Sequence, residues 1–178
     1  VESKSNNIST GDRTPPSKPS TVSLDKSSWN NSNSILIYWA GITDNQSIKS
    51  IQYAIDGGPW TSTEKNTGSG SFALNTSGFS EGEHIISIRA IDDENNYGES
   101  LNVSYFRDTT KPQVAISNLN QLQDISGSVD VFGAIYDVNI KKWTLEYGLG
   151  ENPTSYNEIA AGISNLSNSK LTTWQVDG

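Results

Sequence analysis

Ile48-Lys-Ser-Ile51-Gln-Tyr53-Ala-Ile55 carries an apolar side chain at every second position from Ile51 onward, and Asp56-Gly57-Gly58 follows it. Such alternation is typical of a strand with one buried face, and the Asp-Gly pair is typical of a tight turn. The segment recurs 92 residues later as Ile140-Lys-Lys-Trp143-Thr-Leu145-Glu-Tyr147. An interval close to the length of one β-sandwich domain predicts two copies of one module.

The two copies are introduced by a shared motif. Asp12-Arg-Thr14-Pro-Pro16 and Asp108-Thr-Thr110-Lys-Pro112 have the same spacing of aspartate, threonine and proline, and their aspartates are 96 residues apart. Residues 1–18 are otherwise polar and cannot bury enough apolar surface to order themselves. We therefore predict a flexible linker or tail over residues 1–18.

Short strands are predicted throughout both copies. If a first strand near 21–24 is included, the first copy contains about seven short strands, which is the number in an immunoglobulin-like sandwich. No window shows an apolar stripe of helical period with caps. The apolar alternation that defines the other strands lies at 35–39, 72–74, 84–90 and 101–105, then at 114–116, 129–135, 143–147, 156–160 and 170–176.

The second copy is shorter than the first. Gly178 matches Gly82 at the repeat offset, so nothing corresponds to residues 83–107, which supply the last two strands of the first copy. A sandwich without a central strand exposes apolar core and unpaired backbone groups. We thus predict tandem β-sandwiches over 19–110 and 111–178, the second lacking its last two strands. We expect a longer parent protein, or another chain that donates a strand.

Composition restricts the partners. Twelve basic and twenty acidic residues give a net charge of −8, which disfavours binding to nucleic acid. No apolar run reaches the roughly 18–20 residues that membrane insertion needs. There is no cysteine, and only 18% of the residues are charged. This polar, weakly charged surface suits an extracellular or cell-surface module. The lack of cysteine does not argue against that location, because a sandwich of this size can fold without disulfides.

Several segments resemble one family. Ile51 to Trp60, Gly82 to Asp92 and Asp108 to Pro112, with 143–148 and 171–178 as variants, are similar to the Ig-like and fibronectin type III-like repeats of prokaryotic secreted and cell-surface proteins. The resemblance covers about residues 19–178 and implies the same sandwich fold. It implies a role as a spacer, an adhesin or an accessory module of a hydrolase. In that family a tyrosine often lies near the start of the sixth strand, where this chain has His84.

Gly78-Phe-Ser80-Glu-Gly82 fits the nucleophile pattern of hydrolases, and the single histidine, His84, is nearby. That pattern requires a strand before the serine and a helix after it, whereas the residues after Ser80 alternate as a strand. A histidine four residues away in an extended stretch does not set up a triad. We therefore expect a loop between strands, and no enzyme.

Asp92-Asp93-Glu94-Asn95-Asn96 offers the hard oxygen ligands that calcium prefers. The segment lacks the EF-hand pattern, and polar turns are rich in such residues without binding a metal. We predict no cofactor, with structural calcium at Asp92, Asp93 and Glu94 as the alternative. Asp108 and Asp137 are further candidates.

Exposed aromatic side chains can stack on sugar rings. Trp39 and Trp143 share faces with apolar neighbours and are predicted to be core, whereas Trp60, Tyr97 and Tyr156 are the candidates for a ligand-binding surface. The sequence thus leaves two functions open. One is a non-catalytic spacer or adhesive stalk beside neighbouring domains of the parent chain. The other is an accessory module of an extracellular hydrolase that binds a polysaccharide or another surface protein.

Overall fold

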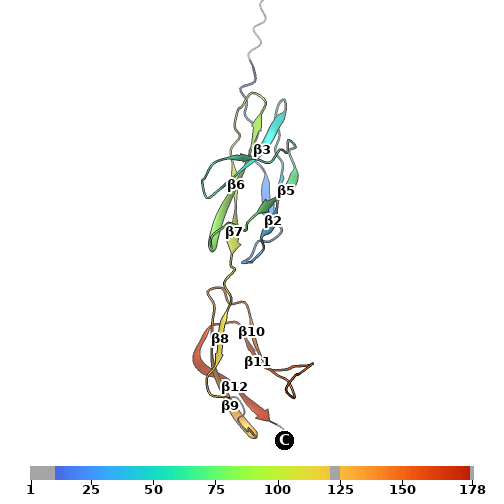
Figure 1. Cartoon of the computed structure of the whole chain (residues 1–178). Helices are drawn as coiled ribbons and strands as arrows, with labels where there is room; N and C mark the ends of the chain where they lie inside the picture. Colours follow the sequence, from blue (N-terminus) through green and yellow to red (C-terminus); the bar gives the residue numbers. More distant parts are fainter. Residues whose placement is uncertain (1–10, 121–124, 177–178) are drawn as a thin grey trace, which may run out of the picture. The chain divides into compact units, whose positions relative to one another are not determined.

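The computed structural model describes residues 11–120 and 125–176, and all their regular elements are β-strands (Figure 1). The chain divides into two compact units, Val1–Thr109 (unit 1) and Thr110–Gly178 (unit 2). The predicted all-β fold is confirmed. No helix of the described residues is long and apolar enough to cross a membrane.

Unit 1 is a sandwich of a three-stranded sheet, in the order β1-β2-β5, and a four-stranded sheet, in the order β4-β3-β6-β7. All neighbouring strands are antiparallel. The strands are β1 (Thr21–Leu24), β2 (Ser34–Ala40), β3 (Ile48–Ile55), β4 (Thr61–Ser62), β5 (Gly70–Asn75), β6 (Gly82–Asp92) and β7 (Leu101–Arg107).

The core of unit 1 lies between these sheets and contains side chains from both. On β2, buried and exposed residues alternate, so that Ile35, Ile37 and Trp39 all face the core. In the opposite sheet, Ile86 and Ile88 of β6 are fully buried in the same core. Alternation therefore predicted which face of β2 and of β6 is buried, and Trp39 is a core residue as expected.

The turn after β3 has the geometry that its sequence predicts. Asp56 and Gly57 both have positive φ, 51° and 72°, and the Gly58 amide donates to the Ile55 carbonyl at 2.8 Å. A turn with two positive φ angles matches the twist of a β-hairpin and favours an Asx-Gly sequence. This turn fixes the position of the Asp56 carboxylate, which takes part in the contacts described below.

Unit 2 has a three-stranded sheet, in the order β12-β9-β8, and a two-stranded sheet, β10-β11. Its strands are β8 (Gln113–Ile116), β9 (Gly127–Tyr136), β10 (Trp143–Tyr147), β11 (Asn157–Gly162) and β12 (Leu166–Val176). These sheets reproduce β5-β2-β1 and β3-β4 of unit 1. The described part of unit 2 contains no counterpart of β6 or β7.

Candidate functional site

Ser80, His84 and Asp56 of unit 1 form the arrangement that most resembles a catalytic site. The His84 Nδ1 atom lies 2.7 Å from Asp56 Oδ2, and its Nε2 atom lies 3.4 Å from Ser80 Oγ. The pairing of β3 with β6 brings Asp56 and His84 together, because the turn after β3 lies beside the start of β6. Asp56 Oδ1 also accepts a hydrogen bond from the Ile85 amide at 2.7 Å. Sequence reasoning found Ser80 and His84 but missed Asp56.

The hydrogen bonds of His84 favour its charged form. Burial by itself would lower the pKa of His84, but hydrogen bonds to the Ser80 carbonyl, 3.0 Å from Nε2, and to Asp56 outweigh it and raise this pKa. The bond from His84 in turn lowers the pKa of Asp56. A general base needs a free lone pair on Nε2, whereas here that nitrogen donates to a carbonyl. The arrangement therefore ties the loop before β6 to the turn after β3.

Unit 1 should become less stable as the pH rises above neutrality. Because folding raises the pKa of His84, its contribution is complete below the unfolded value of about 6.5 and is lost as the pH passes the folded pKa. We expect the melting temperature of unit 1 to fall as the pH rises above about 6.5 for this reason. His84→Gln, which cannot be charged, should abolish this part of the pH dependence in calorimetry; an unchanged profile would contradict the assignment.

The rings of Trp60 and Tyr97 both contact the guanidinium of Arg89 in unit 1. The guanidinium carbon is 3.9 Å from the centroid of the Trp60 ring and 4.3 Å from that of Tyr97. Arg89 Nε also donates to Gln52 Oε1 at 3.0 Å, which holds the guanidinium in place over the paired strands β3 and β6. Cation–π contacts of this kind stabilise the stack. We call Trp60, Arg89 and Tyr97 the aromatic stack.

The aromatic stack unites two of the three residues that the sequence singles out for ligand binding. Tyr97 is 52% exposed, while Trp60 is partly buried. One face of each ring is covered by Arg89, so a ligand has only the remaining faces and edges to contact. Tyr156 is exposed but belongs to unit 2, where it precedes β11. Arg89 was missed because its contacts with the two rings depend on how distant segments of unit 1 fold together.

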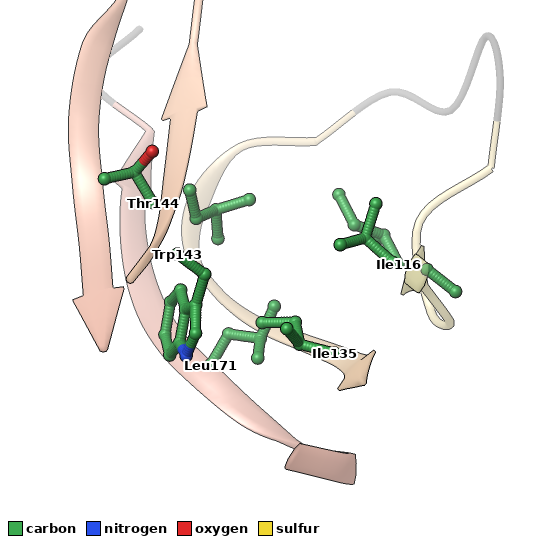
Figure 2. A pocket seen from close by; sticks show the side chains of 8 residues that line it. Ile116, Ile135, Trp143, Thr144 and Leu171 are labelled. Carbon is green, nitrogen blue, oxygen red and sulfur yellow. The ribbon is translucent and has the colours of Figure 1, made fainter. Parts of the chain in front are cut away.

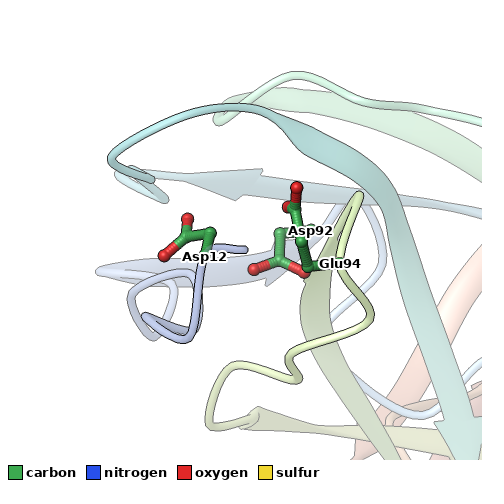
Figure 3. Close-up of side chains that lie close together, drawn as sticks. All are labelled: Asp12, Asp92 and Glu94. Carbon is green, nitrogen blue, oxygen red and sulfur yellow. The ribbon is translucent and has the colours of Figure 1, made fainter. Parts of the chain in front are cut away.

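Asp12, Asp92 and Glu94 form an acidic cluster in unit 1 (Figure 3). Each offers one carboxylate oxygen, and these oxygens all lie within 4.8 Å of one another. Asp92 is completely buried, and its two oxygens accept from the backbone amide and the side-chain amide of Asn96, at 2.7 and 2.6 Å. The same side-chain amide donates to the Asp12 carbonyl at 3.1 Å. The N-terminal segment is thereby joined to the loop after β6.

The cluster has the oxygen chemistry of a calcium site. Asp12 Oδ1 accepts from the Thr14 amide at 2.8 Å, a bond that lowers the pKa of Asp12, while its Oδ2 atom is shielded from solvent and has no hydrogen-bond donor. Asp44 Oδ1 is shielded and without a donor in the same way. Carboxylate oxygens without donors are what a hard cation requires. Asp12 was not among the predicted candidates, although its motif recurs in the sequence.

The other predicted calcium ligands lie outside this cluster. Asp93 Oδ2 accepts a hydrogen bond from Ser47 Oγ. Asp108 donates its amide to the Asn30 carbonyl at 2.9 Å, at the end of β7. Asp137 is buried in unit 2, where its amide donates to Asn165 Oδ1 at 2.9 Å. The structure thus brings together Asp92 and Glu94 of the predicted set and adds Asp12.

No family model matches the chain, and no curated protein matches it. Among solved structures, a chitinase, ChiA74 from Bacillus thuringiensis, is similar at 22% sequence identity with a TM-score of 0.47. The match covers 79% of this chain and 21% of that protein, so this chain spans about a fifth of its length. At this score the likeness decides neither fold nor function, and the fold described above rests on the strand pairing of the chain itself.

Proposed function

We propose that this chain is a non-catalytic, Ig-like repeat segment of a secreted or cell-surface protein, related to the prokaryotic Ig-like and fibronectin type III-like modules that its sequence resembles. Its role is to act as a spacer or stalk beside neighbouring domains of the parent chain. The absence of catalysis is supported by His84, whose ring nitrogens both make structural hydrogen bonds.

The observation that supports the spacer role is the path of the chain through unit 1. The incoming segment is held beside the end of β6, because Asn96 binds the Asp12 carbonyl and the Ser17 amide donates to the Thr43 carbonyl at 2.8 Å. The outgoing segment leaves beside the start of β6, where Arg107 pairs with Gly82. Figure 1 shows these two ends of unit 1 apart. A strand of 11 residues, with a rise of about 3.3 Å per residue, separates them by about 33 Å.

A distance measurement tests this role. The chain has no cysteine, so Arg13→Cys and Lys111→Cys introduce two specific labelling positions for a pair of fluorescent dyes. We expect energy transfer to report a separation of at least about 30 Å, because one sandwich lies between the labels. Labels at Arg13 and Thr43, which lie at the same end of unit 1, are the control for a short distance. A separation below about 20 Å between Arg13 and Lys111 would contradict the spacer proposal.

The second candidate function is an accessory module that binds a polysaccharide or another surface protein, and the aromatic stack is the observation that favours it. Stacked, partly exposed rings with a fixed cation offer an apolar face and hydrogen-bond donors together. If this surface binds a glycan, adding the glycan should change the tryptophan fluorescence, and Trp60→Ala should remove the change. Tyr156→Phe in unit 2 should leave it intact. A spacer alone predicts no response to any polysaccharide.

Structural calcium at the acidic cluster is a further proposal, and it is compatible with either function. An ion held by Asp12, Asp92 and Glu94 would fasten the incoming segment to the loop after β6. A ligand that binds only the folded state raises stability. Millimolar calcium should therefore raise the melting temperature of unit 1, and Asp12→Asn should reduce the increase. An unchanged melting temperature in calcium would contradict the proposal that the acidic cluster binds this ion.

A further inference from the structure

Arg89 of the aromatic stack is a partly buried cation that forms no ion pair with a carboxylate. Among the residues that the structure describes, the ion pairs all involve other cations, and Arg89 Nε donates to the neutral side chain of Gln52. Burial of the guanidinium lowers the pKa of Arg89, and only the contact with Tyr97 opposes this shift. A partly desolvated charge without a counter-ion is costly, so this position favours the binding of an anion.

The guanidinium of Arg89 also has hydrogen-bond donors that no protein group uses. Only its Nε–H group has an acceptor in the described part of the chain. The two terminal nitrogens, Nη1 and Nη2, carry the remaining N–H groups, and neither nitrogen is shielded from solvent. Paired N–H groups of this fork match the two oxygens of a carboxylate, with which they form short, charge-assisted hydrogen bonds. The terminal edge of Arg89 therefore has the chemistry of a carboxylate receptor.

The sheet positions next to Arg89 are uncharged. Gln52 lies directly opposite Arg89 in the pairing of β3 with β6, and the next pair on the same face is Ala54 with Ser87. None of these side chains would repel an anion. The net charge of −8 opposes an anion at long range, but screening over about 8 Å at physiological ionic strength weakens this repulsion. Binding of an anion at Arg89 therefore depends mainly on these local surroundings.

The two rings of the aromatic stack indicate which kind of carboxylate fits. Trp60 and Tyr97 both contact the guanidinium, and Tyr97 is 52% exposed, so part of its ring remains open to a ligand. A uronate, which is a sugar ring with a carboxylate, presents an apolar C–H face and an anion in one rigid residue, and such a face packs well on an aromatic ring. An acidic peptide carries its carboxylate on a flexible stem without a flat face, and it loses side-chain entropy when it binds. The stack therefore favours a uronate over a peptide.

We propose that the aromatic stack binds an acidic polysaccharide, with the carboxylate of a uronate held by the terminal nitrogens of Arg89 and the sugar ring packed against Tyr97 and Trp60. This proposal rests on the second candidate function, in which the same surface binds a glycan, and it names the chemical class of that glycan. A neutral polysaccharide leaves the charge of Arg89 without a partner. It should therefore bind more weakly than an acidic polysaccharide with the same sugar rings.

Titration calorimetry with two matched glycans tests this proposal. One is an oligomer of galacturonate, and the other is the same oligomer with every carboxylate converted to its methyl ester, which keeps the sugar rings and removes the charge. In calcium-free buffer of physiological ionic strength, the chain should bind the acidic oligomer at least about tenfold more tightly than the ester. Arg89→Gln should reduce the affinity for the acidic oligomer to that for the ester. Lys18→Gln, which removes one exposed positive charge outside the stack, is the matched control and should change neither affinity.

The results that would overturn the proposal also separate it from the function on which it rests. Equal affinity for the two oligomers would leave glycan binding in place and exclude a role for the carboxylate, and this comparison needs no variant. A preference for the acidic oligomer that persists in folded Arg89→Gln would place the carboxylate elsewhere. Binding of neither oligomer would overturn both proposals. If a glutamate-rich peptide then bound in an Arg89-dependent manner, the stack would be assigned to an acidic protein partner.

Discussion

Replacing Trp39 by alanine is expected to lower the free energy of unfolding of unit 1 by about 3–5 kcal/mol, the usual cost of deleting a large buried aromatic side chain. Trp39 is only 2% exposed and lies in the core cluster. Its indole Nε1 donates to the Thr67 carbonyl at 3.0 Å. The ring also lies over Gly70, where an added Cβ would meet it at 2.8 Å. Alanine would therefore leave a cavity and an acceptor without its donor.

Chemical denaturation of the two single variants measures this effect. Trp60→Ala is the matched control, because Trp60 lies in the aromatic stack outside the core and should cost about 1 kcal/mol or less. The slope of free energy against denaturant should be the same in both variants, so that the midpoints compare stability. A loss below about 1 kcal/mol for Trp39→Ala would mean that the ring is not a core residue.

The second large effect is expected for Tyr105→Ala, which should lower the free energy of unfolding of unit 1 by about 3–5 kcal/mol. Tyr105 is fully buried on β7. Its ring lies 5.8 Å from that of Phe79 in an edge-on arrangement and 6.4 Å from that of His84. Removing the ring would uncover these two side chains and the junction of β6 with β7.

Tyr105→Phe separates packing from hydrogen bonding. The hydroxyl lies 3.3 Å from the Ser32 carbonyl and 3.5 Å from Asn30 Oδ1, both at the long end of the range for such bonds. We expect this variant to lose no more than about 1 kcal/mol in the same denaturation experiment. If phenylalanine cost as much as alanine, the hydroxyl contacts rather than the ring would dominate, and the packing argument would be wrong.

Most strands of unit 1 could be predicted because each of its sheets has one buried face. Alternation marks Ile35, Ile37 and Trp39 as one face of β2, and the structure buries all three. β4 was missed, since it has only the two residues Thr61 and Ser62, both exposed, and carries no periodic signal. Trp143 was predicted to be core, but it is only partly buried and lines a pocket of unit 2 (Figure 2).

The candidate sites were harder to predict, because each depends on which strands and loops pair. Asp56 and His84 are 28 residues apart and meet through the register of β3 and β6. Asp12 reaches Asp92 only because its segment is fastened to Asn96. Residue type showed which side chains had suitable chemistry. It did not show their partners, because long-range pairing is not encoded in local spacing.

The segment before β1 gives a similar lesson. Residues 1–18 were predicted to be a flexible linker or tail from their polar composition, and residues 1–10 lie outside the described part of the chain. Residues 11–18 form no regular element, yet Thr43 donates its amide to Ser17 Oγ at 2.9 Å, and Pro16 is buried. Composition alone cannot show that a polar segment is fastened by hydrogen bonds to loops distant in sequence.

Calorimetry of a chain that ends at Thr109 tests most directly whether unit 1 is a self-sufficient sandwich that can serve as a repeat module. We predict one cooperative transition, with equal calorimetric and van't Hoff enthalpies, at a temperature close to that of unit 1 in the 178-residue chain. A broad transition without a cooperative heat-absorption peak would contradict the account, because it would mean that the two sheets of unit 1 do not form a core of their own.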